Sequence, residues 1–268
     1  MKKDLFSAFL VPSSAGVRKK RRIFAEPLKR KNIQPMKSLV NLLLLLCLTA
    51  SCTQECNIAG NSSVGSLDGR MLYLRVSSGA GTQTVCIDSC EVIHGRFKFY
   101  SNLDSAVMAQ LFMGDQMFMP LVLESGNLSI QVDHVEQTVS GSPYNDRLYK
   151  FVQQKNRIEN KLWELDRKCM RMMHDGHSPE VIRRAVMPKS DKLTRQMEAL
   201  ETNFIKDNYD NPLGPGCFRL LFSQYPLPIM TDQIRDIMRG APASFLKDPY
   251  VDYYLRRARL NSSRPDQP

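Results

Sequence analysis

The stretch that decides the fold is residues 139–146, which read VSGSPYND. Before this stretch apolar and polar residues alternate, as in residues 72–76 (LYLRV), and a period of two predicts β-strands. After it, apolar residues recur every three or four positions, which predicts helices. Ser142 is a typical N-cap, and Pro143 suits the first position of a helix. The chain therefore changes from strand to helix at Ser142.

The region 56–141 is predicted to contain about seven short strands. Turn residues separate them every 8–12 residues or so, a spacing that is typical of a small antiparallel β-sandwich. Two of the predicted strands, 82–87 and 90–93, flank Asp88 and Ser89, which we interpret as a turn. We therefore expect residues 56–141 to form a sandwich domain.

The region 142–260 is predicted to be helical. A long helix should begin at Pro143, followed by a short helix that Pro188 breaks and a third helix over 189–206. The two long helices are expected to fold back as an antiparallel hairpin. Short helices are predicted at 217–225, 232–239 and 248–260, and residues 261–268 form a polar tail. The predicted fold class is α+β: a small antiparallel β-sandwich followed by a long antiparallel helical hairpin and short C-terminal helices.

The positive charge of the chain is concentrated at its N-terminal end. Ten of the 37 Lys and Arg residues lie in residues 1–35, whereas from Cys52 onward 26 basic residues face 25 acidic ones. A nearly neutral body gives no support for nucleic-acid binding, so we expect no nucleic-acid partner. We interpret residues 1–35 as a basic lead, either an upstream-start artefact or a disordered segment. A nucleic-acid or nuclear-type patch at 17–22 (VRKKRR) is the alternative.

Residues 36–51 have the layout of an export signal. A short basic start at Met36 precedes an apolar run of about 12 residues, shorter than the roughly 20 that a membrane-spanning helix needs. Ala50-Ser51-Cys52 resembles the end of a bacterial lipobox, although Thr49 stands where Leu is usual. That resemblance implies that Cys52 is lipidated and anchors the mature chain to a membrane. We therefore expect a lipoprotein of the cell envelope, at the outer membrane and facing the periplasm.

Cys86 and Cys90 are the candidate disulfide. In one continuous strand they would lie about 13 Å apart, which is too far for a bond. If Asp88 and Ser89 form the expected turn, the two thiols face one another and can pair. Two buried thiols are an equally favoured alternative, and a redox-active pair is favoured less. The sequence contains no Cys-x-x-Cys pair.

Soft metal ligands are densest at Cys169, Met173, His174 and His177. Thiol, thioether and imidazole together suit Cu(I). We favour a simpler interpretation, in which the sulfur side chains pack inside the hairpin and the imidazoles lie in a polar turn. We therefore assign no metal and no cofactor, and retain these residues as weak candidates.

The predicted long helix carries one apolar stripe, formed by Leu148, Val152, Ile158, Leu162, Leu165, Cys169 and Met173. Three aromatic residues lie off this stripe. Tyr144, Phe151 and Trp163 are therefore the candidate interaction surface, toward the sandwich or an outside partner.

Several short motifs, taken in order, resemble a known family. The strand region resembles domain of unknown function 4369, found at the N-terminus of thiol–disulfide lipoproteins of the Gram-negative envelope. The helical region is similar to the same proteins. The motifs are LDG with LYL at 67–74, DS at 88–89, GRFKF at 95–99, LESGN at 123–127, VSGSPYND at 139–146, DNPLG at 210–214 and LKDPYV at 246–251.

The resemblance also implies a function. In such proteins a thioredoxin-like domain with a Cys-x-x-Cys pair usually follows these helices, and we expect this chain to lack it. We therefore expect no catalytic residues here, and a binding or accessory module whose partner is a separate thioredoxin-like protein. A remnant or split thiol–disulfide oxidoreductase is the first alternative, and a soft-metal-binding envelope protein is the second.

Overall fold

The computed structural model describes residues 54–79, 83–225 and 227–262. The expected basic lead (1–35), the expected export signal (36–51), the lipidation residue Cys52 and residues 263–268 of the expected tail lie outside the described residues. The described ranges hold the sandwich and the helical region.

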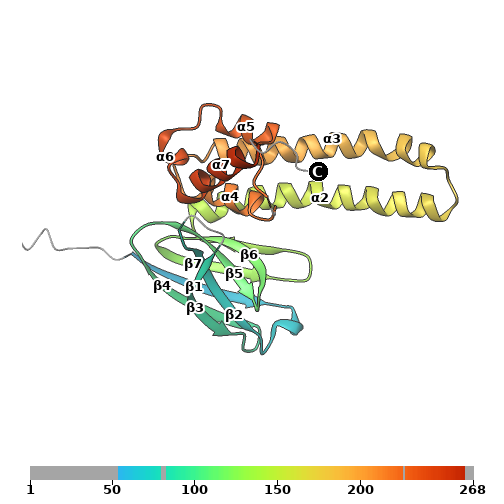
Figure 1. Ribbon diagram of the computed structural model, residues 1–268. Coiled ribbons are helices and arrows are strands. Elements are labelled where there is room, and N and C mark those ends of the chain that lie inside the picture. The colour runs from blue at the N-terminus through green and yellow to red at the C-terminus, as the bar shows by residue number, and fades with distance from the viewer. Residues whose placement is uncertain (1–53, 80–82, 226, 263–268) are drawn as a thin grey trace, which may run out of the picture. The chain divides into compact units, whose positions relative to one another are not determined.

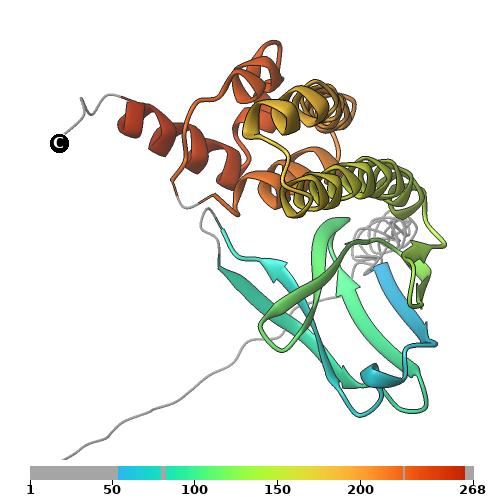
Figure 2. The ribbon, with the colours of Figure 1, turned by 90° about the vertical axis from the view of Figure 1, so that its right-hand side faces the viewer.

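The strand region forms two four-stranded sheets that enclose a common core (Figures 1 and 2). The strand order is β4-β1-β7-β8 in one sheet and β3-β2-β5-β6 in the other. Neighbouring strands are antiparallel except β1 and β7, which run parallel. The predicted sandwich is confirmed, with this one parallel pair. The strands are β1 (Gln54–Ser62), β2 (Met71–Ser77), β3 (Thr84–Glu91), β4 (Arg96–Leu103), β5 (Val107–Met113), β6 (Gln116–Leu123), β7 (Gly126–Val132) and β8 (Gln137–Ser140).

The alternating pattern places one face of each sheet in the core. Leu72 and Leu74 of β2 are fully buried, and so is Phe99 of β4. Burying each such side chain contributes about 1.5–3 kcal/mol relative to leaving it exposed. Phe97 lies over Gly60 of the paired strand β1, where a Cβ atom would overlap the aromatic ring. The close packing of β1 and β4 therefore depends on the missing side chain of Gly60.

The prediction of a turn at Asp88 and Ser89 is wrong. Strand β3 runs through both residues and accommodates a bulge instead, since Leu74 pairs with Asp88 while Arg75 pairs with Cys86. The carboxylate of Asp88 accepts hydrogen bonds from the Ser89 N–H at 2.7 Å and from the Tyr100 N–H of β4 at 3.0 Å. Because strands β3 and β4 are edges of different sheets, Asp88 joins the two sheets at one corner.

The helical region begins with the predicted hairpin of α2 and α3. The expected break at Pro188 is wrong, because α3 continues through this exposed proline. A proline inside a helix costs about 3 kcal/mol, and the burial of Ile182 and Val186 beside it offsets this cost. The helical elements are η1 (Gly65–Leu67), within the sandwich, then α2 (Pro143–His174), α3 (Pro179–Lys206), α4 (Leu213–Phe222), α5 (Asp232–Met238), α6 (Ala243–Leu246) and α7 (Pro249–Ser262).

Asn145, in the first turn of α2, attaches the helices to the sandwich. Its side-chain oxygen accepts a hydrogen bond from the Val122 N–H at 2.9 Å, and its Nδ2 donates to the Val122 carbonyl at 2.7 Å and to Ser142 Oγ at 2.8 Å. Asn145 and Val122 are both fully buried. One turn later, the Tyr149 hydroxyl donates to the Pro120 carbonyl at 2.8 Å, and burial raises the pKa of this phenol. The amide of Asn145 therefore takes the place of a neighbouring strand at the edge of β6.

We predict that Asn145→Ala destabilises the protein by about 2–5 kcal/mol, because it leaves the buried N–H and carbonyl of Val122 without partners. Denaturant unfolding followed by circular dichroism measures the change. The matched control is Asn160→Ala at an exposed position of the same helix, which should change stability by less than about 0.5 kcal/mol. Equal effects of the two substitutions would show that Asn145 does not hold the junction.

Candidate functional site

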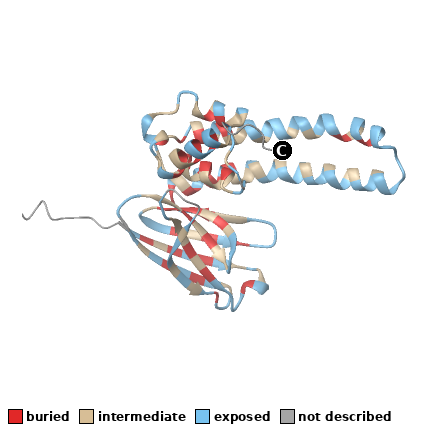
Figure 3. Ribbon diagram, viewed as in Figure 1, coloured by how far each residue is buried: buried red, intermediate tan, exposed pale blue. Residues whose placement is uncertain are grey.

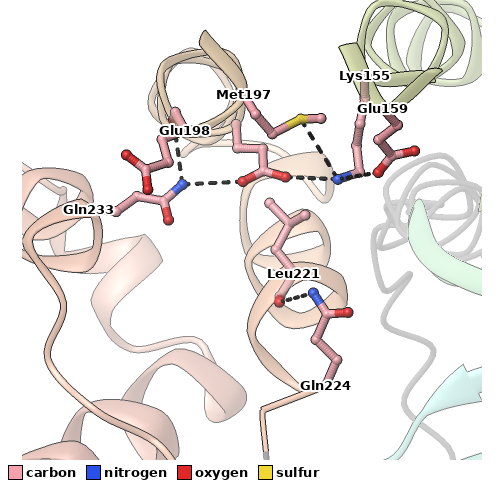
Figure 4. A network of polar contacts seen from close by, with 8 residues as sticks. Lys155, Glu159, Met197, Glu198, Leu221, Gln224 and Gln233 are labelled. Atoms are coloured by element: carbon pink, nitrogen blue, oxygen red, sulfur yellow. Dashed lines mark hydrogen bonds and ion pairs between the residues drawn. The ribbon is translucent and has the colours of Figure 1, made fainter. Parts of the chain in front are cut away.

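A polar network fixes the base of the hairpin (Figure 4). Lys155 Nζ of α2 forms ion pairs with Glu159 at 3.0 Å and with Glu201 of α3 at 2.9 Å. Gln233 of α5 donates to Glu201 at 3.2 Å. Burial alone would lower the pKa of Lys155, but the hydrogen bonds and charges of Glu201 and Glu159 outweigh it and raise the pKa. The network therefore holds α2, α3 and α5 together around a charged lysine.

Beyond this base α2 and α3 extend side by side, and most of their residues are exposed or half-buried, as the colouring in Figure 3 shows. We call residues 158–174 of α2 and 179–200 of α3 the arm. Ile182 and Val186 are the buried residues of the arm, while Ile158, Leu162 and Leu165 of the apolar stripe are half-buried. A pair of helices covers only part of each stripe, so apolar side chains remain in contact with solvent. The large exposed ones are Trp163, Met170, Met173, Val181 and Met187.

The structure separates the three aromatic residues that the sequence placed on one surface. The prediction that Phe151 belongs to the interaction surface is wrong, because Phe151 is buried and stacks on Phe204 of α3 with ring centroids 4.1 Å apart. Tyr144 is partly buried against the core. Trp163 is 59% exposed, as expected, and the guanidinium carbon of Arg167 lies 4.7 Å from its ring centroid. Of the three residues, Trp163 is the one that remains available to a partner.

A pocket near the tip of the arm brings sulfur and imidazole side chains together. Cys169, Met173 and His177 line it, as the sequence grouping anticipated, with a volume of about 460 Å³. His174 does not line this pocket. Met187 of α3 does, and the sequence missed it, because its approach depends on how α3 packs against α2. Within the described ranges, no cluster of three or more His, Cys, Asp or Glu side chains could hold a metal. A metal at this pocket would therefore depend on the thioethers.

The remaining thiols occupy different surroundings. Cys56 of β1 and Cys217 of α4 are buried, and burial raises the pKa of both thiols. Burial also raises the pKa of Cys90, whereas Cys86 is exposed and its thiol donates to the Asp88 carbonyl at 3.3 Å. Cys86 and Cys90 are both free cysteines. The candidate disulfide between them required a turn at Asp88 and Ser89. Both thiols lie on the continuous strand β3 instead, so this turn is not formed.

We predict that Phe151→Ala costs about 3–5 kcal/mol of stability, because it removes a buried aromatic ring and its stacking contact with Phe204. Trp163→Ala should cost less than about 1 kcal/mol, the size of an exposed cation–π contact. Urea unfolding of the two variants gives both values. A large loss from Trp163→Ala would place this ring in the core and remove it as an interaction residue.

Comparison with known proteins concerns mainly the sandwich. No curated protein matches the chain, and no helix within the described residues is long and apolar enough to cross a membrane. Residues 56–148 match the model of a family described as a domain of unknown function, DUF4369. The matched segment runs from β1 through the first turns of α2, and so includes the junction residue Asn145. The region 56–148 of this chain is a domain of the DUF4369 family.

Proposed function

We propose that this protein is a lipid-anchored binding or accessory module of the cell envelope, which presents its arm to a partner. The observation that carries the proposal is the exposed apolar surface of the arm. Trp163 is 59% exposed and Met170 is 67% exposed, on a helix whose base is fixed by buried contacts. Exposed groups of large apolar side chains commonly mark interaction sites. The arm is therefore the candidate docking surface.

The anchor in this proposal is Cys52. The export-signal layout of residues 36–51 and the small residues before Cys52 support it. Strand β1 begins at Gln54, only two residues after Cys52. A lipid on Cys52 would thus be separated from the sandwich by about 7 Å of extended chain at most. The sandwich would then lie close to the membrane surface, at the outer membrane and facing the periplasm.

The partner in this proposal is a separate thioredoxin-like protein. The resemblance to the N-terminal regions of thiol–disulfide lipoproteins supports this choice, because those proteins carry such a domain after the helices. This chain has no Cys-x-x-Cys pair in its sequence. In this proposal the sandwich and the arm contribute binding, and the partner supplies the redox chemistry.

Site-specific photo-crosslinking in the native host tests the docking surface. With Trp163 replaced by benzoylphenylalanine, we expect a cross-linked product whose second component carries a Cys-x-x-Cys thioredoxin-like domain, identified by mass spectrometry. Cys52→Ala should move the protein into the soluble fraction and reduce the yield of this product. The matched control carries the same group at Arg256, an exposed position of α7, and should give at least fivefold less product.

Two results would contradict the proposal. The first is a cross-linked partner without a thioredoxin-like domain, and the second is the same yield from positions 163 and 256. Retention of fully processed Cys52→Ala protein on the membrane would reject Cys52 as the anchor.

Soft-metal binding is the second candidate function. The observation that favours it is the tip pocket, which is lined by Cys169 and Met173 of α2, His177 of the connecting turn and Met187 of α3. Thiolate, thioether and imidazole groups are suitable ligands for Cu(I). The other lining residues are mostly apolar, including Ile182 and Val186.

Competition for Cu(I) with a coloured chelator tests this candidate. The titration is made in a Cys86→Ser background, because Cys86 is an exposed thiol outside the pocket. We expect one Cu(I) per chain and at least a tenfold loss of affinity on Met187→Leu. Met170→Leu is the control, since this exposed methionine lies outside the pocket. Equal affinities of the two variants would exclude the pocket as the site.

A further inference from the structure

A second cavity of the arm has a different chemistry from the tip pocket. It has a volume of about 610 Å³, within the range of small-molecule sites, and lies between α2 and α3. Leu165 and Leu193 contribute its apolar lining, and Glu164 is its one acidic residue. We call it the basic groove, after its six cationic side chains: Lys161, Arg167, Lys168, Arg171, Lys189 and Lys192.

The fold itself brings these cations together. On α2, Lys168 follows Lys161 by seven residues, about two turns, and Arg171 follows Lys168 by three, so the three lie on the same side of the helix. On α3, Lys189 and Lys192 have the same three-residue spacing. Because the hairpin is antiparallel, the two sets meet across the groove. The sequence separation of about 20 residues between them hides this convergence.

The cations of the groove lack ion-pair partners in the part of the chain that the structure describes. No carboxylate of residues 54–79, 83–225 or 227–262 forms a salt bridge with any of the six. Lys155, at the base of the same hairpin, has two carboxylate partners. Like charges gathered in one groove repel one another, although solvent and salt weaken the repulsion, and a bound anion would relieve it. The groove therefore has the electrostatics of an anion site.

Arg167 is already ordered for such a role. Its guanidinium carbon lies 4.7 Å from the centroid of the Trp163 ring, a cation–π contact that restricts the side chain. A guanidinium group binds phosphate oxygens in a bidentate manner, and lysines add mobile ammonium donors. The four cations of α2 extend from Lys161 to Arg171, about 15 Å at 1.5 Å per residue. This length exceeds a single phosphate and suits a ligand with several.

We infer that the basic groove binds a small molecule that carries two or more phosphate groups. The size of the cavity and the six cations around it support a compact polyanion. The nearly neutral balance of the chain from Cys52 onward, 26 basic against 25 acidic residues, does not favour a long one such as nucleic acid. The inference is independent of the proposed partner and of the anchor.

Trp163 provides the measurement, because it is the one tryptophan of the sequence and contacts Arg167. Inorganic tripolyphosphate is titrated into the full chain at low ionic strength, where screening is weak. We expect a saturable change in tryptophan fluorescence with one site per chain, confirmed by calorimetry. Lys168→Gln combined with Lys192→Gln should weaken the affinity at least tenfold, while leaving the contact between Arg167 and Trp163 intact.

The matched control removes two charges of the arm that lie outside the groove. Arg184→Gln combined with Arg195→Gln makes the same change in net charge at exposed positions and should alter the affinity less than twofold. Equal weakening by both double variants would overturn the inference in favour of diffuse attraction. The inference is also overturned if tripolyphosphate shows no saturable binding up to millimolar concentration, or if the chain binds anionic vesicles but not tripolyphosphate. Thermal melts confirm that each variant is folded.

Discussion

The hydrogen bonds between Asn145 and Val122 hold the two halves of the protein together. Strand β6 is the edge of its sheet, so the backbone groups on its outer side need partners. Asn145 satisfies both the N–H and the carbonyl of Val122 with a single side chain. The helix that begins at Pro143 is thereby attached to the sandwich by its first turn. The contact fixes the start of α2 at the sandwich, while Phe204 and Glu201 hold α3 beside α2 through Phe151 and Lys155.

Stability is distributed unevenly along the hairpin. Near the junction, Leu148 and Phe151 are buried, and Lys155 is paired with Glu201 of α3. Farther along, in the arm, only Ile182 and Val186 are buried, and the other apolar side chains are partly or largely exposed to solvent. Such an apolar surface costs free energy in solvent, and a bound partner would recover it. The arm thus combines a fixed base with a surface that is suited to binding.

The two cavities of the arm differ in chemistry. One cavity gathers Cys169, Met173, His177 and Met187, and the other gathers six cationic side chains. Each cavity takes residues from both α2 and α3, so neither exists on an isolated helix. This dependence explains why residues that are unremarkable in the sequence, such as Met187 and Lys192, become part of a candidate site. The geometry of the hairpin therefore decides which ligands the arm could take.

The sequence by itself determined the α+β class, the change from strand to helix at Ser142, the helical hairpin and the exposure of Trp163, because these follow from local periodicity and from the proline at the start of α2. The side chain expected to cap α2, Ser142, makes no capping hydrogen bond and accepts one from Asn145 instead. The sequence did not reveal β1 or β8, the continuity of β3 through Asp88 or that of α3 through Pro188. Only the tertiary structure decided these features, the burial of Phe151 and the two cavities of the arm. The physical reason is that each depends on packing and hydrogen bonds between residues far apart in the chain, which outweigh the local preferences that a sequence pattern reports.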